Sequence, residues 1–290
     1  MTTAIMGVGT IGTIVARHLV QGGERVVLAN RDKSKADKLA VELGDLATSA
    51  DVGDAISKSD VVMLALWLDV MRFFIPEFGG KLVGKIVVDP SNPVGPDGKG
   101  GLKRTLPAEQ SSGQIVASLL PRGAQYVKAF GTLSGQSLAS AARRTPARAV
   151  LFYATDDAGA GETVARLITA AGFDPVKVGG VDQSIRIEFG GDLSEFGLNG
   201  RKLTIAEAEA LIGAEAVPIG FPTAACTTGC SRGRSLRLGR AGGRVRGYSH
   251  AMGKWWLQRD VMLTVRSLFA NTRRHSYLLT PNQQSSERGS

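Results

Sequence analysis

Cysteine is scarce in this sequence. Its 290 residues include only Cys226 and Cys230, which are too few for a disulfide framework. Their spacing lacks the second ligand pair that a structural zinc site needs, so we predict no metal site. The longest apolar run, residues 61–68, is too short to cross a membrane. Because Met1 leads almost directly into a predicted strand, we also expect no signal peptide and a cytoplasmic protein.

Histidine is scarce as well. His18 is the only one of three histidines that precedes residue 226, and its helical position predicts a side chain that faces solvent. We find no Ser-His-Asp set and no paired carboxylates in the sequence. Dehydrogenases that act on alcohols usually need a general acid or base, commonly His or Lys. The sequence therefore gives weak evidence against that class.

The net charge of +9 is unevenly distributed. Residues 226–290 contain twelve Lys and Arg against two acidic residues and carry +10, so the preceding 225 residues sum to −1. The distribution argues against nucleic-acid binding by the body of the protein. Residues 231–247 are mostly Arg, Gly and Ser, with too few apolar residues for a core element. Two interpretations of residues 213–290 stay open: a basic, disordered arm that binds a nucleic acid or an acidic partner, or a frame change or chance extension in a G+C-rich gene.

A glycine-rich turn connects the first predicted strand, residues 3–6, to the first predicted helix. Its sequence is GVGTIG, from Gly7 to Gly12. Apolar residues then recur at four-residue spacing, as on the buried face of a helix that ends near Gly22. Gly7 allows the sharp turn, Gly9 leaves room for a pyrophosphate, and Gly12 lets the helix pack close to the sheet. In this context G-x-G-x-x-G predicts dinucleotide binding at the helix N-terminus.

The second predicted strand, residues 25–29, indicates which dinucleotide is bound. NAD-binding proteins usually end this strand with an Asp or Glu that holds the ribose 2′-hydroxyl. Here Asn30 and Arg31 follow instead. A carboxylate would repel a 2′-phosphate, whereas a guanidinium can bind it with two charge-assisted hydrogen bonds. Lys35 can add a charge, and Asp32 is expected to cap the next helix. The sequence therefore favours NADP(H).

Strand-like and helix-like segments alternate as far as residue 178. Such alternation predicts an α/β fold with a doubly wound, mostly parallel, Rossmann-like sheet. We count one domain over residues 1–212. Further strands are predicted at residues 46–48, 61–66, 85–89, 126–130, 148–155 and 175–178. Further helices are predicted at residues 37–43, 52–56, 70–78, 111–120, 160–171 and 205–212.

The carboxyl ends of the strands are the expected place for ligands. Leu66 and Trp67 follow a fully apolar strand there and are candidates for the cofactor cleft, with ordinary core packing as the alternative. The next strand leads into residues 90–96, which include three prolines and should form a rigid wall. A mobile segment is expected from there to Lys103.

Eight segments carry a resemblance to a known family. They are GVGTIG, ANRDKSKA, LALWLD, KIVVDPSNPV, EQSSGQIVASLLP, VKAFGTL, LFYATDD and AGFDPVKVGG. In these segments the sequence resembles the NADPH-dependent reductases of the deazaflavin coenzyme F420, which are related to the cytoplasmic domains of STEAP-type metalloreductases. The resemblance covers about residues 3–212 and ends before the basic tail.

The resemblance implies cofactor-binding positions and no catalytic side chain. It places the 2′-phosphate on Asn30, Arg31 and Lys35, and the pyrophosphate on Gly9, Thr10, Ile11 and Gly12. It also implies that the cleft for the nicotinamide and deazaflavin rings is lined by Leu66, Trp67, Pro90, Asn92, Pro93, Val94, Phe130, Gly131 and Thr132. Hydride then passes directly between stacked rings, so that positioning carries most of the catalysis. A homodimer is also implied.

Several alternatives remain open from the sequence. An NADPH reductase could use FMN, FAD or a ferric chelate as its acceptor, since apolar walls discriminate ring systems poorly. A β-hydroxyacid or imino-acid dehydrogenase is less favoured, because residues 213–290 do not read as the large helical domain of those enzymes. A non-catalytic NADP(H) sensor would bind nucleotide without turnover and use the basic tail as its partner-binding arm.

Overall fold

An eight-stranded sheet organises the part of the chain that the structure describes. The computed structural model describes residues 1–98 and 101–213, so Cys226, Cys230 and the basic tail lie outside the described residues. The strands of the sheet are β1 (Thr2–Met6), β2 (Arg25–Ala29), β3 (Ala47–Ser49), β4 (Val61–Leu64), β5 (Ile86–Asp89), β8 (Gln125–Ala129), β9 (Val150–Ala154) and β10 (Asp174–Gly179). The helices are α1 (Thr10–Gln21), α2 (Lys33–Leu43), α3 (Val52–Ser57), α4 (Leu68–Leu82), α5 (Ser112–Leu119), α6 (Gly135–Ser140), α7 (Ala158–Ala170), α8 (Ser184–Ile187) and α9 (Ile205–Gly213).

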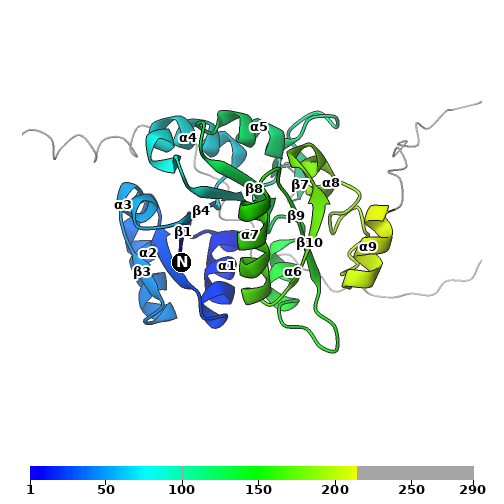
Figure 1. Cartoon of the computed structure of the whole chain (residues 1–290), viewed down its shortest axis with the longest axis horizontal. Coiled ribbons are helices and arrows are strands. Elements are labelled where there is room, and N and C mark those ends of the chain that lie inside the picture. Colours follow the sequence, from blue (N-terminus) through cyan, green and yellow to red (C-terminus); the bar gives the residue numbers. More distant parts are fainter. Residues whose placement is uncertain (99–100, 214–290) are drawn as a thin grey trace, which may run out of the picture.

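The strand order confirms the predicted doubly wound sheet. It runs β10-β9-β8-β5-β4-β1-β2-β3, and every neighbouring pair except β8 and β9 is parallel (Figure 1). The chain turns from β1 toward β2 and β3, and then returns to place β4 on the other side of β1. The carboxyl ends of β1 and β4 therefore flank the switch point at which open α/β sheets bind their ligands.

Alternating side chains of the buried strands supply two hydrophobic cores. In β4, Val61 and Met63 face the core under α1, α2, α6 and α7, while Val62 and Leu64 face the core under α3, α4 and α5. All four side chains are fully buried, as the continuous apolar run predicts. Figure 1 shows α1, α6 and α7 side by side on one face of the sheet. A third core joins β9 and β10 to α8 and α9.

The second half of the domain differs from the prediction in the direction of β9 and in two short helices, α6 and α8, that were not predicted. The strand β9 runs antiparallel to β8 and pairs with it only near its end, through Tyr153 and Ala154. Alternation of apolar residues has the same period in either direction, so the sequence pattern does not reveal strand direction. The short helix α6 was not predicted, and it packs against α1.

The packing of α6 explains why the expected position of His18 is wrong. His18 is partly buried, with Nε2 3.0 Å from the carbonyl oxygen of Leu138 at the end of α6, and its ring meets Phe173 edge-on. Burial lowers the pKa of His18, the hydrogen bond to Leu138 opposes that shift, and the positive charge of Arg143 adds to it. The side chain is a packed contact between two helices.

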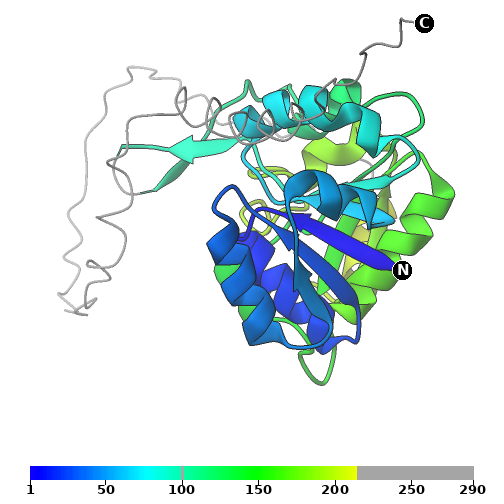
Figure 2. The ribbon, with the colours of Figure 1, turned by 90° about the vertical axis from the view of Figure 1, so that its left-hand side faces the viewer.

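Two short strands form a hairpin that overlaps the segment that was expected to be mobile, of which residues 99–100 lie outside the described residues. The strands β6 (Val94–Pro96) and β7 (Leu102–Arg104) pair antiparallel, apart from the main sheet. Figure 2 shows this hairpin projecting from the body of the protein. The side chain of Arg104 fixes its base by donating hydrogen bonds to the carbonyl oxygens of Phe189 and Gln110. Over the described ranges, no helix has both the length and the apolar character needed to cross a membrane.

Candidate active site

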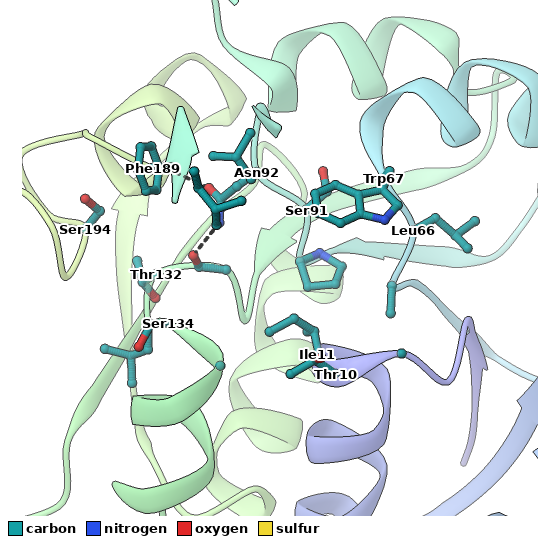
Figure 3. A pocket seen from close by; sticks show the side chains of 18 of the residues that line it. Thr10, Ile11, Leu66, Trp67, Ser91, Asn92, Thr132, Ser134, Phe189 and Ser194 are labelled. Atoms are coloured by element: carbon teal, nitrogen blue, oxygen red, sulfur yellow. Dashed lines mark hydrogen bonds between the residues drawn. The ribbon is translucent and has the colours of Figure 1, made fainter. Parts of the chain in front are cut away.

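A pocket of about 350 Å³ lies at the carboxyl ends of β1, β4, β5 and β8 (Figure 3). Its volume falls within the usual range for small-molecule sites, roughly 300–1,000 Å³. The glycine turn, the segments after three strands, the hairpin and the segment after α8 contribute to it. The lining residues are Gly9, Thr10, Ile11, Ala65, Leu66, Trp67, Pro90, Ser91, Asn92, Val94, Leu102, Gly131, Thr132, Leu133, Ser134, Gly135, Phe189, Ser194 and Phe196.

The three glycines of the turn differ in their surroundings. Gly7 has φ +96°, and a Cβ added there would lie 2.6 Å from the carbonyl oxygen of Ala65. A Cβ on Gly12 would lie 1.9 Å from the carbonyl oxygen of Gly7, so helix α1 could not approach the turn as closely. A Cβ on Gly9 would meet no atom within 4 Å. Gly7 and Gly12 are thus required by the fold, whereas the space beside Gly9 opens into the pocket.

The N-terminus of α1 has no side-chain cap. Gly9 is its N-cap residue and offers no side chain to the free backbone amides of the first turn. By contrast, backbone amides in the first turns of α5 and α6 donate hydrogen bonds to the side chains of their N-cap residues, Ser111 and Ser134. The unpaired amides and the helix dipole make the start of α1 suited to bind an anion.

The end of β2 lies beside the glycine turn. Asn30 accepts a hydrogen bond from the Val8 amide at 3.3 Å and donates one to the Asp32 carbonyl at 3.1 Å, so its side chain connects the two segments. Asp32 caps α2 as predicted, and hydrogen bonds from Ser34 lower the pKa of its carboxyl group. Arg31 is exposed. Within the described part of the chain, the Arg31 side chain makes no ion pair. Lys35 is exposed in the first turn of α2.

Asn92 fixes the relative positions of three segments around the pocket. Its Nδ2 donates to the Gly131 carbonyl at 2.8 Å, and its Oδ1 accepts from the Phe189 amide at 2.7 Å (Figure 3). A Cβ on Gly131 would lie 2.7 Å from the Pro90 carbonyl oxygen, so the segments after β5 and β8 are in direct contact. Phe130 has a left-handed φ of +65° and lies wholly in the core.

Of the nine residues that were expected to line the ring cleft, seven line the pocket and two lie elsewhere. Leu66, Trp67, Pro90, Asn92, Val94, Gly131 and Thr132 line the pocket. Phe130 is buried in the core instead, and the Pro93 carbonyl accepts a hydrogen bond from Thr105 at the base of the hairpin. Trp67, the N-cap residue of α4, is 52% exposed at the rim. The alternative of ordinary core packing therefore does not describe Trp67.

A buried polar network supports the segment after β5. Asp89 accepts hydrogen bonds from Lys128 Nζ at 2.8 Å and Tyr126 OH at 2.7 Å through Oδ2, and from the Ser91 amide at 2.8 Å through Oδ1. Lys128 Nζ also donates to the Ser91 carbonyl at 2.6 Å. Burial and the neighbouring Asp89 carboxylate raise the pKa of Tyr126 well above its ordinary value, so its hydroxyl stays a donor. The network holds both backbone polar groups of Ser91.

Sequence reasoning missed the wall formed by the segment after α8. Phe189 and Phe196 line the pocket with ring centroids 4.5 Å apart. Glu188, fully buried, accepts hydrogen bonds from the amides of Ser112 and Gly113 at the start of α5. Glu195 accepts hydrogen bonds from the Ser134 amide and the Ser137 hydroxyl at the start of α6. Two carboxylates more than fifty residues away in sequence thus complete the caps of these helices, and no local pattern reveals such pairing.

The pocket is mostly apolar and uncharged. Among the lining residues that the structure describes, none has an ionisable side chain. Glu188 and Glu195 lie next to it, but their carboxylates are engaged with helix N-termini. The site can therefore hold planar apolar rings in contact, and the described residues offer no side chain for general acid–base catalysis at its wall.

Sequence comparisons relate the chain to known reductases. Residues 2–93 match a family model described as NADP oxidoreductase, coenzyme F420-dependent. The F420-dependent NADP reductase of Methanothermobacter thermautotrophicus is 25% identical over 194 residues, which cover 63% of this chain and 83% of the relative. The glutamyl-tRNA reductase of Stutzerimonas stutzeri is 46% identical over 61 residues, only 20% of this chain and 14% of that enzyme. The first of these two relatives thus shares most of its length with this chain.

Structural comparisons agree with the fold. A hypothetical protein from Sinorhizobium meliloti has 29% sequence identity and a TM-score of 0.62, over 70% of this chain and 95% of that one. A structure from Arthrobacter sp. FB24, provisionally named an F420-dependent NADP reductase, has 22% identity and a TM-score of 0.56, over 64% of this chain and 87% of its own. Both comparisons support an α/β fold that accounts for most of the described residues.

Proposed function

We propose that this chain, which matches the family model of coenzyme F420-dependent NADP oxidoreductases over residues 2–93, transfers a hydride between NADP(H) and the deazaflavin coenzyme F420 by direct contact of the two ring systems. The family match and the relative support an NADP-dependent oxidoreductase, as the sequence resemblance predicted. The acceptor and the transfer step are the proposed part.

The nucleotide-binding side of the proposal rests on the glycine turn and the end of β2. The open space beside Gly9 and the uncapped start of α1 fit a pyrophosphate. Arg31 and Lys35, exposed after β2, are the proposed ligands of the 2′-phosphate. Asn30 would contribute mainly by holding the end of β2 against the glycine turn, through its hydrogen bonds to Val8 and Asp32.

The absence of an ionisable side chain from the described pocket wall is the observation that carries the proposed transfer step. Reduction of a carbonyl group to an alcohol requires a proton donor next to the substrate oxygen. A hydride that moves between two carbon centres of stacked rings needs mainly contact, at roughly 3–3.5 Å, and exclusion of water. Apolar walls at Leu66, Trp67 and Phe196 fit that requirement.

The proposal is tested by following NADPH oxidation with F420, with FMN and without acceptor in parallel reactions. We expect fast turnover with F420 alone. Turnover with FMN alone would overturn the proposed acceptor and indicate a general flavin reductase. Tight NADPH binding without turnover on any acceptor, including a ferric chelate, would indicate the non-catalytic sensor. The implied homodimer stays a prediction, which sedimentation equilibrium of the full chain checks.

A further inference from the structure

Two hydroxyl groups in the pocket wall have no hydrogen-bond partner. Ser91 and Thr132 are 8% and 5% exposed, and both line the pocket. Their oxygens, Ser91 Oγ and Thr132 Oγ1, are shielded from solvent and unpaired among the described residues. Buried polar groups in native proteins are usually hydrogen-bonded, and leaving one unpaired costs free energy. Two unpaired hydroxyls in one pocket are consistent with a ligand that hydrogen-bonds both of them.

The other polar side chains of the described pocket wall are engaged or lie elsewhere. Asn92 uses both its amide oxygen and its amide nitrogen in contacts between segments. Ser134 Oγ accepts from the Ser137 amide, and Ser194 Oγ donates to the Gly191 carbonyl and accepts from the Gly197 amide. Thr10 is exposed at the start of α1, beside the proposed phosphate site. Within the inner, mostly apolar part of the described pocket, Ser91 and Thr132 are thus the polar side chains that can hydrogen-bond a ligand.

The fold brings these two residues to one place. They follow β5 and β8, which are neighbours in the sheet with Asp89 paired in register to Lys128. The segments that carry them touch at Gly131 and Pro90, and Figure 3 shows both side chains at the pocket. The Ser91 backbone is held by Asp89 and Lys128. Rotation about χ1 moves a serine or threonine hydroxyl between staggered positions without moving this backbone.

We propose that Ser91 and Thr132 hydrogen-bond the amide edge of a ring bound in this pocket, and so fix the ring's orientation and select ligands that carry such an edge. A hydroxyl can both donate and accept, and therefore matches the C=O and N–H groups of an amide. Two ligands of the proposed reaction share this chemistry: the carboxamide of nicotinamide and the lactam edge of the deazaflavin. The inference rests on the proposed function, because it needs one of these rings in the pocket.

The test uses Ser91→Ala and Thr132→Val in the full-length protein, with Thr132→Ser as the variant that keeps the hydroxyl. We expect each of the first two to weaken either NADPH binding or acceptor KM about three- to tenfold, as for one lost hydrogen bond. Weaker NADPH binding with unchanged acceptor KM assigns the hydroxyls to the nicotinamide carboxamide. Raised acceptor KM with unchanged NADPH binding assigns them to the acceptor. Thr132→Ser should retain the wild-type values.

Three readouts separate this role from damage to the fold. Affinity for 2′-phospho-ADP-ribose, which is NADP without its nicotinamide, should stay unchanged in both variants. Thermal unfolding temperatures should be equal or higher, because removal of an unpaired buried hydroxyl is neutral or stabilising. Thr3→Val and Ser59→Ala are matched controls, since both hydroxyls are buried and unpaired away from the pocket lining. They should leave NADPH binding and acceptor KM unchanged.

The proposal would be overturned if both variants fold and neither NADPH affinity nor acceptor KM changes more than about twofold. It would also be overturned if 2′-phospho-ADP-ribose binding weakens as much as NADPH binding, because the effect would then lie outside the ring. Failure of the proposed function has a different signature: the wild-type protein itself would not bind NADPH or would not turn over F420.

Discussion

Lys128 Nζ lies 2.8 Å from Asp89 Oδ2, and the two residues are register partners on adjacent parallel strands. Both side chains are almost completely buried. The pair sits directly beneath the segment that lines the pocket, because Lys128 also binds the Ser91 carbonyl. A structural ion pair therefore determines where the proposed ring-binding hydroxyl of Ser91 lies.

Replacing Lys128 with Met should destabilise the protein strongly. The substitution leaves the Asp89 carboxylate buried without its counter-charge, which costs about 3–5 kcal/mol in the free energy of unfolding. Urea denaturation measures this loss. The matched control is Lys81→Met on the exposed face of α4, which should cost less than about 0.5 kcal/mol. Equal losses in the two variants would contradict the role of the buried pair.

Alanine at Gly9 should mainly weaken nucleotide binding, whereas alanine at Gly12 should mainly destabilise the fold. A methyl group on Gly9 meets no atom, so Gly9→Ala should lower stability by less than about 1 kcal/mol, as for a changed N-cap, while blocking the approach of the pyrophosphate. A methyl group on Gly12 would overlap the Gly7 carbonyl, so Gly12→Ala should lower the unfolding temperature itself. Thermal unfolding without nucleotide and NADPH titration give the two values. A Gly9→Ala protein that binds NADPH normally would contradict the proposed phosphate site.

Arg31→Ala should weaken NADPH binding and spare NADH binding. A bidentate contact between a guanidinium and a 2′-phosphate is worth about 1.5–3 kcal/mol, and NADH lacks that phosphate. Arg25→Ala is the control, because Arg25 is an exposed arginine at the opposite end of the same strand. Titration of both nucleotides against both variants checks the prediction. Equal losses of NADPH and NADH affinity in Arg31→Ala would exclude the assignment.

Trp67→Ala should raise the acceptor KM without unfolding the protein. Its ring is half exposed at the pocket rim, and stacking on a planar acceptor is worth about 0.5–1.5 kcal/mol, or roughly two- to tenfold in KM. Phe73→Ala is the control, since Phe73 is 50% exposed on the same helix and does not line the pocket. Steady-state kinetics with F420 at saturating NADPH measure the effect. An equal change in both variants would indicate a general effect of α4.

Glu195 should make stability depend on pH in the acid range. Burial works against its charge, but hydrogen bonds from Ser137 and Ser134 and contact with Lys202 prevail, and the pKa of Glu195 is lowered on folding. Its stabilising contribution is therefore complete above the unfolded pKa, about 4.3, and is lost as pH falls through the lower folded value. The difference in unfolding free energy between wild type and Glu195→Gln should be constant above about pH 5 and shrink below it. A difference that does not change with pH would contradict this account.

Short-range patterns were sufficient for the nucleotide-binding half of the fold. Apolar periodicity located α1, and a continuous apolar run located β4, because each of these elements buries its side chains in a regular order. The expected capping by Asp32 is likewise a contact within two residues. The direction of β9 and the presence of α6 depend on packing with distant elements, and local sequence does not encode them.

Only part of the pocket was predicted, because strand topology determines some of its lining residues and long-range contacts determine the others. Leu66, Trp67 and Pro90 follow strands whose carboxyl ends must meet at one edge, so topology alone placed them. Phe189 and Phe196 reach the pocket because Glu188 and Glu195 hold their segment against α5 and α6. Those contacts span more than fifty residues, and a single sequence does not show them.

The wall containing Phe189 and Phe196 is also the last part of the pocket that the ribosome makes. A ribosome makes the glycine turn within the first twelve residues, but it adds this wall only after some 180 more. Domains generally fold as units, and the core that holds α1 also includes side chains of β9 and α7, so the glycine turn reaches its final surroundings only when these later elements are present. The complete pocket therefore belongs only to a chain that has passed residue 196.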